Sequence, residues 1–302
     1  MQIPRLTAAG AATTPVLEIA CEAAGPPDGP VAVLLHGFPY DVRCYDAAAA
    51  ILAREGVRVI APYLRGYGST RYRDPDTLRS GQQGALGQDL LDLLDALGIE
   101  RAVVGGYDWG GRAACIAAAL APERVTGLVT VGGYNIQNIA RSGEPRPPEA
   151  ESAAWYTFYF LTERGRAGLT RYTDELCGLL WRQWSPTWTG AGAAFPATAP
   201  SLHNPDFVDT VIHSYRHRRR LAKGDPRYDA VEERLATRPP IPVPAIALDA
   251  LADGLGPDDS SGDAPLFTGG FEVRPLDGIG HNVPQEAPEA FARAVSDLAS
   301  AT

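Results

Sequence analysis

Short apolar segments define most of the strands predicted for this chain. They occupy residues 31–35, 57–61, 103–104, 125–131, 245–248 and 271–274. The first of them, residues 31–35, is a continuous apolar run, as expected of a strand that is buried on both faces. Residues 16–22 instead alternate between apolar and polar side chains and predict an antiparallel edge strand. The small and polar residues before them, 1–15, predict a loose lead-in.

Helical patterns separate most of these strands. The predicted helices cover residues 45–54, 89–97, 112–119 and 288–298. Alternating strands and helices over residues 16–133 imply a mostly parallel sheet with helices on both faces. The alternation stops at about residue 136 and resumes after the proline-rich segment 239–244. We therefore predict an α/β core domain formed by residues 1–135 and 239–302, with a helical cap domain inserted at 136–238.

A glycine-rich turn follows the strand that begins at Val103. Its sequence, Gly106-Tyr107-Asp108-Trp109-Gly110, is the pattern of a nucleophile elbow, a strained strand-to-helix turn that exposes a reactive side chain. The residues two positions away on either side must be small, and Gly106 and Gly110 meet this condition. Asp108 holds the place usually taken by serine, and the helix start behind it favours its anion. Taken alone, the turn could also be a loop with a structural aspartate.

A nucleophile at Asp108 would work together with a histidine and with an acid that orients this histidine, and the sequence contains candidates for both. His281 lies late in the chain, between the last predicted strand and the last predicted helix. Asp249 and Asp253 both follow the strand at 245–248 and could orient this histidine. We favour Asp253, because it lies in the loop beyond the strand end and can turn towards His281. Nucleophile, acid and histidine would then follow one another in this order along the chain.

An oxyanion hole is the fourth expected part. His36-Gly37-Phe38-Pro39 directly follows the strand at 31–35. The backbone N–H of Phe38 can pair there with that of Trp109, next to the nucleophile, to stabilise an oxyanion. Any one of these features could be structural, but all of them together at strand ends favour a catalytic site.

The chain resembles the α/β-hydrolase superfamily, in the branch of epoxide hydrolases and of haloalkane or haloacetate dehalogenases with an aspartate nucleophile. The resemblance covers nearly the whole chain from residue 16. Four segments carry it: residues 36–39, 65–69, 106–111 and 280–282. It implies the α/β-hydrolase fold, with an eight-stranded, mostly parallel sheet, flanking helices, a helical cap over the cleft and no cofactor.

An aspartate nucleophile points to a saturated carbon as the site of attack. A carboxyl with an ordinary pKa of about 3.9 is ionised at neutral pH and needs no base. Its attack on a carbon that bears a leaving group gives an alkyl ester. Water activated by His281, with Asp253 behind it, can hydrolyse that ester at the Asp108 carbonyl. The substrate is thus expected to be an epoxide or an alkyl halide, and not a carboxylic ester.

The leaving group decides between these two substrates. The resemblance to epoxide hydrolases implies two cap tyrosines that donate to the epoxide oxygen, Tyr156 and Tyr215, with Tyr159 as the fallback. Tyr215 lies on a predicted helix opened by Asn204-Pro205. His36, Pro39, Trp109 and Tyr159 are the expected substrate contacts. The aromatic-rich cap, with four of the five tryptophans, predicts an apolar small-molecule substrate.

Dehalogenation is the second hypothesis. Trp109 follows the nucleophile in haloalkane dehalogenases too. Arg112 matches one of the two arginines that bind the substrate carboxylate in haloacetate dehalogenases, but Trp109 occupies the place of the other. We therefore interpret Arg112 as structural and favour epoxide hydrolysis. A non-hydrolytic isomerase, a cyclase or a ligand-binding protein with this fold is the hypothesis from another class.

Charge and composition limit the partners, the cellular location and the metal content that can be expected. The formal net charge of −9 argues against a nucleic-acid partner. The basic run at 216–220 is interpreted as a solvated helix face rather than an anion site. Four scattered cysteines, no secretory signal and no long apolar run predict a cytoplasmic protein without a membrane span. The five histidines have no spacing that favours a metal site, and a homodimer is possible.

Overall fold

The computed structural model describes residues 6–300 of the 302-residue chain. The strands of this part form one sheet in the order β1-β2-β4-β3-β6-β7-β8-β9, and the two-residue strand β5 (Arg71–Tyr72) pairs with β2. Neighbouring strands from β4 to β9 run parallel, as predicted. Their bounds are β3 (Val31–Leu35), β4 (Arg58–Pro62), β6 (Ala102–Gly106), β7 (Val125–Val131), β8 (Ala245–Ala250) and β9 (Phe271–Leu276).

The structure corrects the prediction for the first sheet edge. Residues 7–13, predicted as a loose lead-in, form the edge strand β1 (Thr7–Thr13). The predicted edge strand, β2 (Leu17–Ala24), pairs antiparallel with β1 on one side and with β4 on the other. The small and mostly exposed side chains of β1 show no alternation, so only its backbone pairing with β2 makes it a strand. The prediction for residues 1–5 lies outside the described part.

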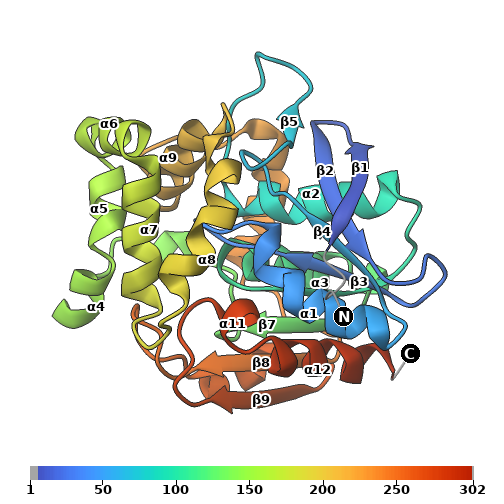
Figure 1. Cartoon of the computed structure of the whole chain (residues 1–302). Helices are drawn as coiled ribbons and strands as arrows, with labels where there is room; N and C mark the ends of the chain where they lie inside the picture. Colours follow the sequence, from blue (N-terminus) through green and yellow to red (C-terminus); the bar gives the residue numbers. More distant parts are fainter. Residues whose placement is uncertain (1–5, 301–302) are drawn as a thin grey trace.

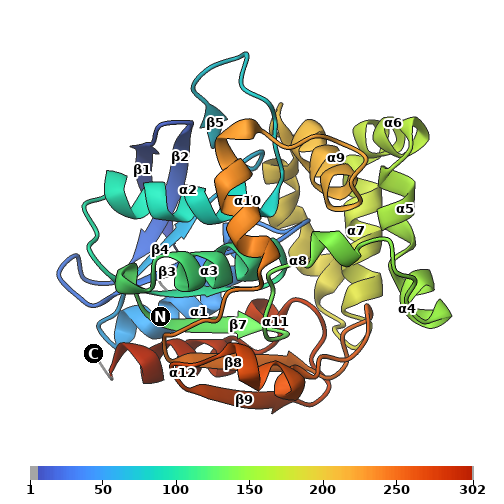
Figure 2. The ribbon, with the colours of Figure 1, turned by 180° about the vertical axis from the view of Figure 1, so that it is seen from behind.

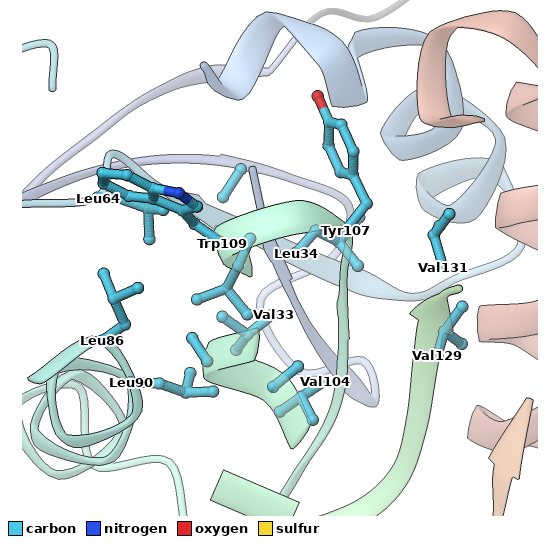
Figure 3. Close-up of a cluster of buried hydrophobic side chains, with 14 of the residues drawn as sticks. Val33, Leu34, Leu64, Leu86, Leu90, Val104, Tyr107, Trp109, Val129 and Val131 are labelled. Carbon is cyan, nitrogen blue, oxygen red and sulfur yellow. The ribbon is translucent and has the colours of Figure 1, made fainter. Parts of the chain in front are cut away.

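Helices cover both faces of the sheet (Figures 1 and 2). One layer contains α1 (Asp46–Arg54) and α12 (Pro288–Ala299), and the other contains α2 (Gln83–Ala96) and α3 (Asp108–Leu120). α2 begins six residues before its predicted start, because the glycines in its first turns hide the apolar pattern. In Figure 3, Leu86 and Leu90 of α2 face Val33 and Val104 of the sheet.

A separate group of helices lies at one end of the sheet, seen at the left of Figure 1. We call this group the cap helices: α4 (Pro148–Ala153), α5 (Trp155–Phe160), α6 (Glu163–Arg171), α7 (Thr173–Trp184), α8 (Ala191–Thr198) and α9 (Phe207–Arg218). α10 (Asp229–Ala236) also falls within the predicted cap range but packs against α2, where Glu232 accepts a hydrogen bond from the Gly84 N–H. In the described part of the chain, no helix is both long and apolar enough to span a membrane.

Candidate active site

The turn after β6 holds Asp108 in a strained conformation. Its φ of 51° lies in the left-handed region, which non-glycine residues rarely adopt. The turn needs glycine on both sides. A Cβ on Gly110 would lie 1.9 Å from the Leu35 carbonyl oxygen, and one on Gly106 would lie 2.4 Å from the Gly110 carbonyl carbon. The Phe38 N–H donates to Asp108 Oδ1 at 2.8 Å. One donor of the expected oxyanion hole is therefore already bound to the carboxylate.

Trp109 contributes to this turn through both its backbone and its ring. Its N–H lies in the first turn of α3 (Asp108–Leu120), where backbone donors have no partner within the helix. Its indole is fully buried and stacks on Phe38, with the ring centroids 5.8 Å apart. Tyr107 and Trp109 leave the turn in different directions (Figure 3). Asp108 lies between these two residues, and its side chain lines the cavity described below.

His281 lies between two carboxylates. Its Nδ1 is 2.6 Å from Oδ2 of Asp253, and its Nε2 is 4.0 Å from Oδ2 of Asp108. The loops after β8 and β9 bring the acid and the histidine together, and Asp253 also accepts a hydrogen bond from the Leu255 N–H, which orients it. His281 Nε2 is buried and has no hydrogen-bond partner in the described part of the chain. This nitrogen can therefore act on a group bound beside Asp108.

Asp249, the alternative acid, has another role. It accepts hydrogen bonds from both the backbone N–H and the hydroxyl of Ser260. These contacts fasten the loop after β8 and involve no histidine. Asp258 lies in the same loop and accepts from the Ala250 N–H. Burial, together with the charge of Asp253, raises the pKa of Asp258 to about 7.

The charges around His281 set its protonation state. Burial by itself would lower its pKa, but the charge and hydrogen bond of Asp253, followed by the charge of Asp108, raise the pKa to about 9. The imidazole is therefore a cation at neutral pH. Neutralising Asp108 removes one of these charges, so the pKa of His281 falls and the ring can become a base.

This coupling predicts a measurable change in the Asp108→Asn variant. The amide is neutral, as an ester on Asp108 would be, and we expect the pKa of His281 to fall from about 9 towards its ordinary value. NMR titration of the histidine ring signals measures this pKa, and the His281→Gln variant assigns the signal among the five histidines. An unchanged pKa would show that Asp108 does not influence His281.

Two tyrosines of the cap helices lie together near this site. Tyr156 of α5 and Tyr215 of α9 are buried, and their ring centroids lie 5.5 Å apart at an interplanar angle of 86°. Burial raises the pKa of Tyr156 to about 12 and that of Tyr215 well above its ordinary value. Both hydroxyls therefore remain protonated at neutral pH and can donate. Tyr215 also packs on Phe38 and Trp109, with centroid distances of 5.6 and 6.2 Å.

The structure places the other predicted substrate contacts elsewhere. His36 is fully buried, and its Nε2 accepts a hydrogen bond from a backbone N–H of the loop after β4. The carbonyl of Pro39 accepts from the indole of Trp181. Tyr159 packs among the cap aromatics, and none of His36, Pro39, Tyr159 or Trp109 lines the cavity beside Asp108. These residues shape the walls behind the site. Of the two predicted donors, Tyr156 lines this cavity and Tyr215 lies behind it, against Phe38 and Trp109.

A cavity of about 410 Å³ opens beside Asp108. Its lining comes from α3, α5, the end of α9 and two loops: Asp108, Arg112, Gln137, Asn138, Ile139, Ser142, Arg146, Ala154, Tyr156, Thr157, Arg218, Arg219 and Leu255. Arg146, Arg218 and Arg219 were not predicted as cavity residues, and Arg112, interpreted from the sequence as structural, lines the cavity as well. A helical spacing could have found two of them, because Arg112 follows Asp108 by four positions and Arg218 follows Tyr215 by three.

Comparison with known proteins agrees with this geometry. Residues 30–205 match the family model of the alpha/beta hydrolase fold. The chain belongs to the α/β-hydrolase fold family. A crystal structure from Klebsiella pneumoniae, provisionally described as an epoxide hydrolase, is 44% identical, with a TM-score of 0.94 and coverage of 98% of this chain and 97% of that one. This likeness places the α/β-hydrolase in the epoxide hydrolase branch.

Curated relatives of this α/β-hydrolase carry the same description. Epoxide hydrolase B of Mycobacterium tuberculosis is 33% identical over 205 residues, which are 62% of this chain and 56% of that protein. The match thus spans little more than half the length of that relative. An epoxide hydrolase of Caballeronia sordidicola is 29% identical over 286 residues, 86% of this chain and 84% of that protein.

Proposed function

We propose that this protein hydrolyses an epoxide to a vicinal diol through a covalent ester on Asp108. The observation that carries the proposal is the carboxylate of Asp108 between the Phe38 N–H and the imidazole of His281. A carboxylate bound in this way can attack a saturated carbon and is then positioned for attack by water. The names of the relatives support the epoxide as substrate.

The first half-reaction forms the ester. Oδ2 of Asp108 attacks an epoxide carbon while the carbon–oxygen bond of the ring breaks. The hydroxyls of Tyr156 and Tyr215 donate to the oxygen as it gains charge, and one of them gives it a proton. The ester is neutral, so the pKa of His281 falls and the imidazolium can return a proton to the tyrosinate.

The second half-reaction releases the diol. Neutral His281 takes a proton from water, and the oxygen of that water bonds to Cγ of Asp108. The negative charge on Oδ1 is stabilised by the Phe38 N–H. The bond between Cγ and Oδ2 then breaks, and the diol oxygen takes the proton from His281. Loss of the carboxyl proton of Asp108 to His281 restores the starting state, with one epoxide and one water consumed for each diol.

Isotope labelling tests this mechanism. A single turnover with excess enzyme in H₂¹⁸O, over a panel of neutral and carboxylate-bearing epoxides, is followed by mass spectrometry of the diol and of the Asp108 peptide. We expect the first diol to be free of ¹⁸O and the peptide to gain the label. Label in the first diol would show direct attack by water. If wild type formed no more diol than Asp108→Asn across the whole panel, the proposed activity would be wrong.

The two tyrosines predict a defined defect in ester formation. Tyr156→Phe and Tyr215→Phe should each slow this step by about 10²-fold, the effect of losing one donor to a developing oxyanion. The double variant should be slower still. Stopped-flow tryptophan fluorescence under single-turnover conditions measures the step. Tyr159→Phe is the matched control. Tyr159 packs on Trp155 and Phe160, whereas Tyr215 packs on Phe38 and Trp109 beside Asp108. An equal loss in the control variant would contradict the assignment.

Dehalogenation is the second candidate function, because two buried indole N–H groups could bind a departing halide. Nε1 of Trp109 and Nε1 of Trp184 are buried and have no acceptor among the described residues. Indole N–H groups are donors that a departing halide can use. Halide release from 1-chlorobutane and from chloroacetate, measured beside diol formation, compares the two activities directly. Faster halide release than diol formation would favour this candidate.

A further inference from the structure

Arg112 is a buried cation that has no partner among residues 6–300. It lies on α3 one helical turn after Asp108, and its side chain lines the cavity. Only 6% of Arg112 is exposed. In the part of the chain that the structure describes, its guanidinium forms no ion pair and no hydrogen bond, and its Nε is fully enclosed. Burying an ion without a partner is costly, so such a group favours a bound anion.

The cavity around Arg112 is strongly basic. Four arginines line it, namely Arg112, Arg146, Arg218 and Arg219, and Asp108 is the one acid in the lining. This contrasts with the net charge of −9 of the whole chain. It also differs from the apolar pocket predicted from the cap aromatics. The basic run at 216–220, interpreted from the sequence as a solvated face, therefore contributes two of its arginines to the cavity.

Arg146 and Arg219 are largely occupied by other contacts. Arg146 lies 3.6 Å from the carboxylate of Glu151, and about half of its side chain is exposed. Arg219 donates to the carbonyl of Ser142 at 2.6 Å and stands over the ring of Phe158. These two side chains form the rim of the cavity.

Arg218, in contrast, shares the situation of Arg112. It forms no ion pair with a described residue, and its one hydrogen bond runs from Nη2 to the hydroxyl of Ser214 at 3.1 Å. Its buried Nε has no acceptor, and its guanidinium carbon lies 4.3 Å from the ring centroid of Tyr215. Burial and the neighbouring charge of Arg218 lower the pKa of Arg112 to about 10, which leaves it charged at neutral pH. An anion between the two arginines would relieve their repulsion.

We propose that the epoxide substrate carries an oxyanion, a carboxylate or a phosphate, which Arg112 and Arg218 bind. The inference rests on the proposed epoxide hydrolysis. Guanidinium groups bind such anions through paired hydrogen bonds. Asp108 and Arg112 both line the cavity from the first turns of α3. On α9, Tyr215 and Arg218 are three positions apart and share one face. Each helix thus presents a reacting group and, about 5 Å further along, an anion-binding group. The anionic group should therefore lie only a few bonds from the epoxide.

Matched pairs of charged and neutral epoxides test the proposal. The pairs are 3,4-epoxybutanoate with 3,4-epoxybutanamide, and glycidyl phosphate with glycidol. In the wild type we expect kcat/KM for the better anion to exceed that of its neutral partner by about 10- to 100-fold, the usual size of a charge-assisted contact. Whichever pair shows the preference identifies the oxyanion. In Arg112→Gln and Arg218→Gln the ratio should fall towards one, mainly through a higher KM for the anion.

Arg216→Gln is the control variant. Arg216 lies on the same helix as Arg218 but pairs with Glu163 and is absent from the cavity lining, so its loss should leave the ratio unchanged. Equal turnover of charged and neutral epoxides by the wild type would overturn the inference while leaving epoxide hydrolysis intact. The inference would also be overturned if the ratio of kcat/KM for the charged and the neutral epoxide were the same in Arg112→Gln, Arg218→Gln and Arg216→Gln. Turnover of no epoxide would instead refute the proposed function.

A salt titration of the wild type covers the case in which Arg112→Gln does not fold. Circular dichroism and thermal melting show whether the variants are folded. We expect added NaCl to raise KM for the anionic epoxide and to leave KM for its neutral partner unchanged. The same response of both substrates, together with an unchanged ratio in Arg218→Gln, would overturn the inference.

Discussion

Replacing His281 by glutamine is expected to stop turnover after the first half-reaction and to leave the substrate attached to Asp108. Attack by the ionised carboxylate needs no base, so ester formation should continue. Glutamine cannot take the proton from water, and hydrolysis of the ester should slow by about 10⁴-fold, the upper end of what a general base contributes. The reason for expecting this effect is that Nε2 of His281 lies 4.0 Å from Asp108 and has no hydrogen-bond partner among the described residues.

Intact-protein mass spectrometry detects the trapped ester. His281→Gln is mixed with pools of epoxides and of alkyl halides, and the modified peptide is then mapped. A gain of one whole epoxide on the Asp108 peptide would support both the nucleophile and the substrate class. A gain of an alkyl group without its halogen would identify a dehalogenase and contradict the role given to the tyrosines.

The control for trapping is the double variant Asp108→Asn/His281→Gln, which should gain no mass. An adduct that persists in the double variant would lie on another residue. If no adduct formed from either pool and the wild type were also inactive, the ester mechanism would be wrong for these substrates. This result would favour the hypotheses of an isomerase, a cyclase or a ligand-binding protein.

Asp253→Asn and Asp249→Asn are expected to have different effects, although the two residues lie four positions apart. Asp253 contacts Nδ1 of His281 at 2.6 Å, and its neutralisation should lower kcat by about 10³- to 10⁴-fold, as in triads whose acid is replaced. Asp249 contacts Ser260 instead. Its replacement should lower the free energy of unfolding by about 1–3 kcal/mol, the cost of a broken buried hydrogen bond.

Steady-state kinetics and denaturant unfolding of the two variants separate these effects. The turnover of folded Asp249→Asn should stay close to that of the wild type. The pKa of His281 should fall in Asp253→Asn, because the largest of the charges that raise it is removed. Activity that survived Asp253→Asn but not Asp249→Asn would move the catalytic acid to Asp249.

The sequence by itself determined the centre of this protein. Parallel strands buried on both faces are rich in apolar and β-branched side chains, so β3, β4 and β7 could be located within one residue. The turn at Asp108 has a steric requirement for glycine at 106 and 110, which leaves a short and readable pattern. The carboxyl ends of parallel strands meet at one sheet edge, and this rule by itself predicts that Asp253 and His281 lie near the turn.

Only the tertiary structure decided what depends on contacts between distant segments. β1 is a strand because β2 offers it backbone partners, and α10 packs with the core because Glu232 meets α2. Local sequence contains no information on such pairings. The same holds for Arg112 and Arg218, because a long charged side chain can reach solvent from almost any helix. The two side chains become enclosed beside Asp108 only when α9 packs near the first turns of α3. The tertiary structure therefore creates the candidate anion site.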